Sequence, residues 1–216
     1  MLLGIDTCGG TGTIALARWS EDAVFVLAQR ELAGKTYSAQ LMPAIQEMLG
    51  EMLAAEESDA AALQVVVVVN GPGSFTGVRI GVSTAKALAE ALSIPLVALS
   101  RLAVLAQKAR TDAAALDAGR GEVYFRTHRD EALLRPEEAG KQFSGPVAVC
   151  EESTAGFFPE ARLVEPPSAA DALLFAVPRL LARDFNDVEA IDGNYVRRSD
   201  AELFAKPGVR SEGGKA

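Results

Sequence analysis

The order of the elements predicted for the first hundred residues constrains the fold more than any other feature of the sequence. Runs of apolar and β-branched residues separated by glycine-rich or polar links predict short strands, and apolar residues at helical spacing predict two long helices. In chain order these are strands over 2–7, 13–18 and 24–30, a helix over 38–53, a strand over 65–69, a helix over 74–92 and a strand over 96–99. The strand over 65–69 consists only of valine, as expected for a central strand covered on both faces.

A weaker copy of the same order is predicted in the second half. Asp6 and Asp117 take matching places at strand ends, each before a glycine-containing turn. The elements predicted here are strands over 113–117, 122–127, 146–150 and 162–164, and a helix over 168–183 kinked by Pro178. The order βββαβαβ is the ribonuclease-H-like layout, and two copies predict an α/β, two-lobed actin-like (ASKHA) fold with a degenerate second copy. We place the lobes at 1–103 and 104–216, with a short flexible tail from residue 211.

Composition excludes several classes of protein. Of 216 residues, 49% are hydrophobic and 23% charged, the ordinary balance of a globular protein, and the net charge of −8 disfavours unaided tight binding to a nucleic-acid backbone. The uncharged stretch over 60–78 is interrupted by glycine and proline, so no membrane segment is expected. Two cysteines are too few for a disulfide framework, and this usage together with the absence of a basic leader favours a cytoplasmic protein. One histidine, His128, cannot supply a two-histidine zinc site.

The segment Gly71–Gly81 is the strongest motif. It lacks the Gly-Lys-Ser/Thr of a Walker A loop and the third glycine of a dinucleotide fingerprint. Gly73, Gly77 and Gly81 recur every four residues, which leaves a smooth helix face. Three interpretations stay open: an anion site at the helix N-terminus, a surface for close contact with another protein, or glycines that pack the helix on its own sheet.

This motif, the opening Gly4–Thr7, the segment Asp117–Tyr124 and the late Tyr195-Val196-Arg197 together resemble the TsaB (YeaZ) family, in order over nearly the whole chain. The resemblance implies a non-catalytic partner in making threonylcarbamoyladenosine at position 37 of tRNAs that read codons beginning with adenine. It implies a TsaD-like transferase and a TsaE-like ATPase as partners. It also implies no cofactor, metal or catalytic residue of its own, because the partner complex would use ATP and a metal ion. Contact with tRNA is expected only through the complex, with the basic pair Arg197–Arg198 as a weak candidate.

One departure from the family pattern concerns the start of the first long helix. Members often carry His-Ser-Glu-x-Leu-x-Pro there, whereas this chain has Tyr37 in place of the histidine. The histidines on the equivalent helix of the catalytic paralogue are metal ligands, so the departure removes a metal site, and we expect Tyr37 to pack. A small-molecule kinase or ATPase of the actin-like class stays open as an alternative. A glycoprotease is disfavoured because zinc ligands are missing.

Two groups of residues are predicted to carry the function. Degenerate phosphate-loop positions are expected at Asp6, Thr7, Gly10, Asp117 and Gly119. The helices over 38–53 and 74–92 are expected to lie side by side and to present a shared apolar face to the partner, or to a second copy in a homodimer. This partner interface is predicted at Leu41, Ile45, Met48, Met52, Phe75, Gly77, Val78, Arg79, Gly81, Val82 and Ala85.

Overall fold

The structure is a computed structural model that describes residues 1–20, 23–33, 36–55, 63–128 and 130–196. The basic pair Arg197–Arg198 and the tail from residue 211 lie outside the described residues.

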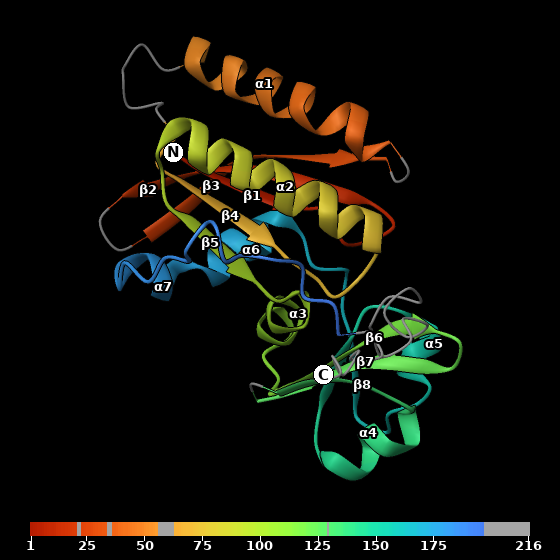
Figure 1. Cartoon of the computed structure of the whole chain (residues 1–216). Helices are drawn as coiled ribbons and strands as arrows, with labels where there is room; N and C mark the ends of the chain where they lie inside the picture. The colour runs from red at the N-terminus through yellow and green to blue at the C-terminus, as the bar shows by residue number, and fades with distance from the viewer. Residues whose placement is uncertain (21–22, 34–35, 56–62, 129, 197–216) are drawn as a thin grey trace, which may run out of the picture.

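The first lobe is a five-stranded sheet with the order β3-β2-β1-β4-β5. The central strand β1 pairs antiparallel with β2 and parallel with β4. Helices α1 and α2 contact each other and lie on one face of this sheet (Figure 1). The elements are β1 (Leu2–Asp6), β2 (Gly12–Ser20), β3 (Ala23–Leu32), α1 (Tyr37–Ala55), β4 (Val65–Val69), α2 (Phe75–Leu92) and β5 (Leu96–Leu99).

The second lobe repeats this topology. Its sheet has the order β10-β9-β6-β7-β8, which matches the first lobe strand for strand. The predicted duplication of a βββαβαβ unit is therefore confirmed, and so is the actin-like architecture. The elements are β6 (Ala113–Gly119), β7 (Glu122–Thr127), β8 (Asp130–Leu134), α4 (Pro136–Gln142), β9 (Val147–Val149), α5 (Glu152–Ala155) and β10 (Ala161–Leu163).

Three further helices lie outside the two repeats: α3 (Arg101–Ala109), which joins the first lobe to the second, and α6 (Ala169–Phe175) and α7 (Val177–Leu181), which follow the second lobe. Helix α6 contacts β1, β2, β3 and β4 and lies on the face of the first sheet opposite α1 and α2 (Figure 1). Helix α3 contacts β6, β7 and β9. The predicted lobe boundary near residue 103 falls inside α3, and α6, after the second lobe, packs on the first sheet. The predicted kink is present, since α6 and α7 are separated at Ala176, just before Pro178.

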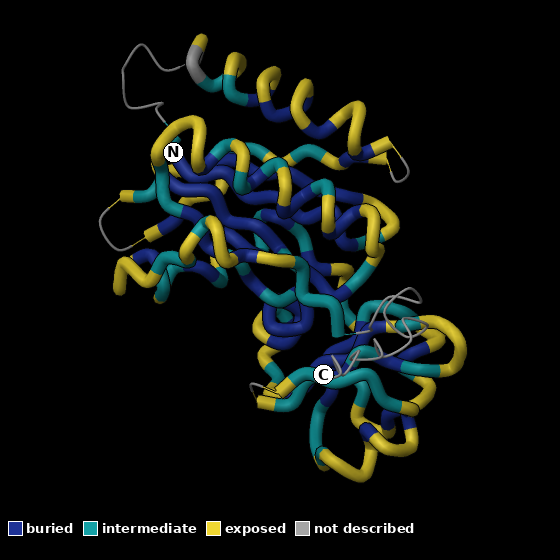
Figure 2. The backbone as a smooth tube through the Cα atoms, in the orientation of Figure 1, coloured by how far each residue is buried: buried dark blue, intermediate teal, exposed yellow. Residues whose placement is uncertain are grey.

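Burial follows the strand pattern. All five valines of β4 are buried, as the sequence predicts (Figure 2). In β6 the alternation puts Ala113 and Ala115 in the core that includes α4, and Ala114 and Leu116 in the core that includes α3. Both faces of this strand are thus covered by helices. Among the described helices, none is long and apolar enough to cross a membrane.

Candidate functional site: the cleft between the lobes

A cleft of about 490 Å³ lies between the two lobes. Its first wall comes from the turn after β1, the start of α2, the start of α1 and the first residue of α3. Its second wall comes from the end of β6, from β7 and from the residue before α5. The lining residues are Cys8, Gly9, Gly10, Tyr37, Gly73, Ser74 and Arg101 on the first side and Asp117, Ala118, Tyr124 and Glu151 on the second.

The glycine motif fixes the start of α2 against the end of β1. A Cβ atom on Gly73 would lie 2.3 Å from the carbonyl oxygen of Cys8, and one on Gly77 would lie 2.0 Å from that of Thr7. The Thr7 hydroxyl donates to the Gly77 carbonyl oxygen at 2.6 Å, and the Ser74 N–H donates to the Cys8 carbonyl oxygen at 2.8 Å. Of the three interpretations of the motif, the structure shows the third, in which the glycines pack the helix on its own sheet. The expected approach of a partner's backbone at Gly77 and Gly81 is wrong, because Thr7 occupies that space.

The two aspartates at the strand ends share one local geometry, as predicted. An oxygen of Asp6 accepts from the Cys8 N–H at 2.8 Å, and an oxygen of Asp117 accepts from the Gly119 N–H at 2.7 Å. Their environments differ, since Asp6 is buried and Asp117 is exposed. Of the other predicted loop positions, Thr7 is buried by α2, whereas Gly10 and Gly119 are exposed at the turns.

Arg101 is, with Tyr124 and Glu151, one of the cleft residues that the sequence analysis did not predict. Its Nε lies 3.8 Å from Oδ2 of Asp6, and the two side chains are only 10% and 3% exposed. Burial alone lowers the pKa of Arg101, but the Asp6 carboxylate raises it, and the balance is a raised pKa that keeps the guanidinium charged. Burial raises the pKa of Asp6, against the opposing effect of Arg101. The sequence held no signal for this pair, because its partners are 95 positions apart, one ending β1 and the other beginning α3.

Tyr37 packs, as expected. It is buried, its ring would contact a Cβ atom at Gly12 at 2.7 Å, and its hydroxyl donates to the Gly9 carbonyl oxygen at 3.0 Å. The hydrogen bond and the ring contact of Tyr37 hold the turn after β1 against the start of α1.

An actin-like fold implies a magnesium nucleotide in this cleft, and the residues present do not fit one. A Cβ atom on Gly9 would lie 2.6 Å from Nη2 of Arg101, so the guanidinium occupies the space beside the turn where phosphates would sit. Asp6, the acid placed to position a metal ion, is ion-paired with Arg101 instead. The second wall adds Asp117 and Glu151, which would repel a triphosphate. Within the described residues no three His, Cys, Asp or Glu side chains are grouped as a metal site requires.

The predicted partner interface divides into buried and exposed residues. Met52 is half-buried, whereas Phe75 and Arg79 are exposed. The remaining eight face the chain's own sheet and are buried, which contradicts the prediction that they form an outer face: Leu41, Ile45, Met48, Gly77, Val78, Gly81, Val82 and Ala85.

An exposed aromatic cluster lies at the start of α2. The Arg79 guanidinium carbon lies 4.0 Å from the centre of the Phe75 ring, and the rings of Phe75 and Tyr195 are 5.2 Å apart. The Phe75 side chain is 42% exposed, so the cluster is available on the surface. The side-chain position of Tyr195 was not predicted, because it arrives from the other end of the chain.

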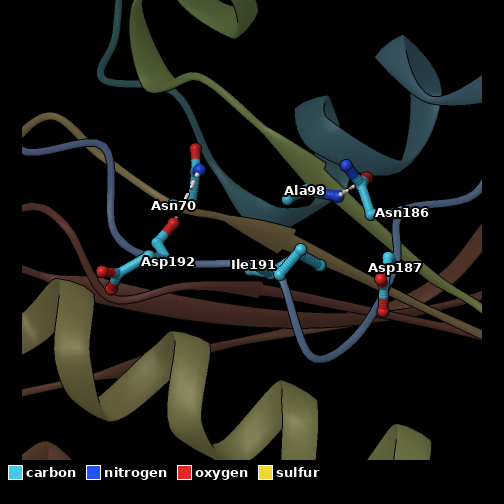
Figure 3. Close-up of a pocket in the computed structure, with 7 residues that line it drawn as sticks. Asn70, Ala98, Asn186, Asp187, Ile191 and Asp192 are labelled. Atoms are coloured by element: carbon cyan, nitrogen blue, oxygen red, sulfur yellow. Dashed lines mark hydrogen bonds between the residues drawn. The ribbon is translucent and has the colours of Figure 1, made fainter.

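A smaller polar pocket of about 320 Å³ lies where the C-terminal segment covers the edge of the first sheet (Figure 3). The Ala98 N–H on edge strand β5 donates to Oδ1 of Asn186 at 2.9 Å, and Nδ2 of Asn70 donates to the Asp192 carbonyl oxygen at 3.2 Å (Figure 3). The side chain of Asp192 accepts from the Gly193 N–H. The bond from Ala98 covers edge strand β5, which would otherwise be free to pair with other chains, and the other two hold the C-terminal segment in place, which is a structural role.

The matching family model and two curated relatives belong to proteins of tRNA threonylcarbamoyladenosine synthesis. The family model described as TsaD, tRNA N6-adenosine threonylcarbamoyltransferase, matches residues 25–154. The chain is 42% identical over 127 residues to the tRNA threonylcarbamoyladenosine biosynthesis protein TsaB of Bacillus subtilis, covering 57% of this chain and 52% of that protein. It is 33% identical over 164 residues to TsaB of Escherichia coli, covering 67% and 68%. The chain thus spans about half the length of the first relative and two thirds of the second.

A solved structure agrees with these relatives. The crystal structure of a Pseudomonas aeruginosa protein with similarity to peptidase YeaZ matches with a TM-score of 0.73 and 27% identity, over 91% of this chain and 99% of that one.

Proposed function

The chain belongs to the TsaB (YeaZ) family, and on that premise we propose that it is a non-catalytic partner of a TsaD-like threonylcarbamoyl transferase. In this role it binds and activates the transferase that forms threonylcarbamoyladenosine at position 37 of tRNAs reading codons that begin with adenine. A TsaE-like ATPase completes the assembly, and tRNA is held by the complex rather than by this acidic chain alone.

One observation carries the non-catalytic assignment: Asp6 is ion-paired with Arg101, and Arg101 lines the cleft where an actin-like enzyme would hold a magnesium nucleotide. Freeing Asp6 for a metal ion would leave the Arg101 charge buried without its partner, which is strongly unfavourable. Both cysteines are also poor nucleophiles, because burial raises the pKa of Cys8 well above its usual value and that of Cys150 to about 12.

The partner surface that we propose is the outer side of α1 and α2. The buried stripes of both helices face the sheet, which leaves the opposite sides exposed (Figure 2). Met42 on α1 is 37% exposed and Phe75 on α2 is 42% exposed, and Arg79 lies next to Phe75. An exposed aromatic beside an arginine is the composition enriched at the centre of protein interfaces. The same surface serves for self-association when the transferase is absent.

Light scattering on a mixture of this chain with the TsaD-like protein of the same cell tests the proposal. We expect a complex with the summed mass, and we expect Phe75→Asp to weaken it at least tenfold. Phe157→Asp is the matched control, because Phe157 is 50% exposed on the second lobe, outside the proposed surface. Equal loss in both variants, or no loss in Phe75→Asp, contradicts the proposed surface. Failure of the unaltered chain to form any complex contradicts the proposed function.

A further inference from the structure

The two walls of the interlobe cleft carry opposite charges. The first wall holds the Arg101 guanidinium and the N-terminus of α2, an 18-residue helix whose dipole is positive at this end. The second wall holds the carboxylates of Asp117 and Glu151. Asp6 offsets part of the Arg101 charge from behind and is not among the lining residues.

Arg101 on the first wall and Glu151 on the second form no ion pair or hydrogen bond with each other among the described residues. Among the described residues, Nε of Arg101 and Oε2 of Glu151 are both buried without a hydrogen-bond partner. Arg101 is only 8% exposed, and its ion pair with Asp6, at 3.8 Å, is too long for a hydrogen bond. Nε of Arg101 lies next to Asp6, but the Arg101 and Glu151 side chains both line the cleft. Buried charged groups are normally hydrogen-bonded, so two cleft residues whose hydrogen bonds are incomplete indicate a ligand between them.

From this arrangement we infer that the cleft binds a small zwitterion, an organic molecule with a carboxylate at one end and an ammonium group at the other. The carboxylate lies toward Arg101 and Ser74, and the ammonium group lies toward Glu151 and Asp117. A nucleotide is disfavoured because its several negative charges would meet one arginine and two carboxylates. A simple anion would leave the carboxylates of the second wall without a positive partner, and a simple cation would leave the Arg101 guanidinium without a hydrogen-bond acceptor in the cleft.

The inference goes beyond the role as a transferase partner and does not depend on it, because the binding is measured on the chain alone. Two other polar side chains of the cleft, Tyr37 and Ser74, already form hydrogen bonds within the protein. The Tyr37 hydroxyl donates to Gly9, and the Ser74 oxygen accepts from the Gly77 N–H as the cap of α2, which leaves its own proton free to donate.

Isothermal titration calorimetry with probes that differ only in their charged ends tests the inference. Glycine, β-alanine and γ-aminobutyrate carry both charges at increasing separation, whereas acetate and methylammonium carry one each. We expect at least one of the three zwitterions to bind at least tenfold more tightly than either one-ended probe. We expect no binding of magnesium ATP.

Variants locate the site. Glu151→Gln removes the half-buried one of the two negative charges of the second wall, and we expect it to weaken binding of the best zwitterion at least tenfold. Glu152→Gln is the matched control, since Glu152 is adjacent and exposed but does not line the cleft. Arg101→Lys keeps the charge of the first wall but loses the fork of donors, and should weaken the same probe.

Four results overturn the inference. The first three are no binding of any zwitterion, binding of acetate as tight as that of the best zwitterion, and equal affinity in Glu151→Gln and Glu152→Gln. Displacement of the zwitterion by magnesium ATP would also contradict it, because the cleft would then be a nucleotide site.

Discussion

Replacing Gly77 by alanine tests whether α2 is fitted to its own sheet. A Cβ atom there would lie 2.0 Å from the Thr7 carbonyl oxygen, whereas real Cβ contacts stay above 3.0 Å, so the helix must move by about 1 Å. Overpacking of this kind costs about 1–3 kcal/mol. Loss of the 2.6 Å bond from the Thr7 hydroxyl to Gly77 adds about 1 kcal/mol. Alanine regains about 1 kcal/mol through its higher helix propensity. The expected net loss of unfolding free energy is therefore about 1–3 kcal/mol.

Gly50→Ala is the matched control. Gly50 lies inside α1, is exposed, and has no atom within 4 Å of the position a Cβ would take. The same change there should stabilise the protein by about 1 kcal/mol. Urea unfolding followed by circular dichroism compares the two midpoints at unchanged slope. If Gly77→Ala is as stabilising as Gly50→Ala, then the first turns of α2 do not press on β1 and the account of the glycine motif is wrong.

Three further predictions concern the core, the contact between the lobes and the thiols. Val82→Glu should cost several kcal/mol of unfolding free energy, because Val82 is 5% exposed in the core and the carboxylate would be unpaired; a stable variant that only fails to bind the transferase would contradict this. Glu131 on β8 accepts hydrogen bonds from the Ser100 hydroxyl and from Nδ2 of Asn194, which belong to the first lobe and the C-terminal segment. Glu131→Ala should therefore lower the urea midpoint by an amount equivalent to about 1.5–3 kcal/mol, and an unchanged midpoint would show that these bonds do not hold the lobes together. Because its pKa is raised to about 12, Cys150 should react with a thiol reagent at pH 8 at least about 100-fold more slowly than in the urea-unfolded chain; equal rates would contradict its burial.

The elements of the first lobe could be predicted because each carries a strong local signal. The run of valines marks β4, the glycines before β2 mark a turn, and the proline after α2 marks the end of that helix, and all three are visible in the sequence itself. In the second lobe β8, α4 and α5 were not predicted, since they have five, seven and four residues and no clear apolar period. Only the repeat of the first sheet's topology in the second sheet identifies them as counterparts of first-lobe elements.

The orientation of an apolar helix stripe could not be predicted. Val78, Val82 and Ala85 give the same pattern whether the stripe faces the chain's own sheet or a partner. In the structure the stripe faces the chain's own sheet, because Thr7, directly after β1, packs against Gly77 and Gly81. The return of the chain to the first lobe after residue 168 was missed for a related reason. An amphipathic helix such as α6 does not encode which of two similar sheets it covers.

The rate of threonylcarbamoyladenosine formation by the TsaD-like transferase, measured with and without this chain, tests the central claim most directly. We predict that the reaction requires the chain, and that Asp117→Ala and His128→Ala each retain more than about a tenth of the rate, because loss of a true general acid or base typically costs about 10²–10⁴-fold. We also predict no ATP turnover by the chain alone. A thousandfold loss in either variant with the complex intact, or sustained ATP hydrolysis by the isolated chain, would contradict a non-catalytic role.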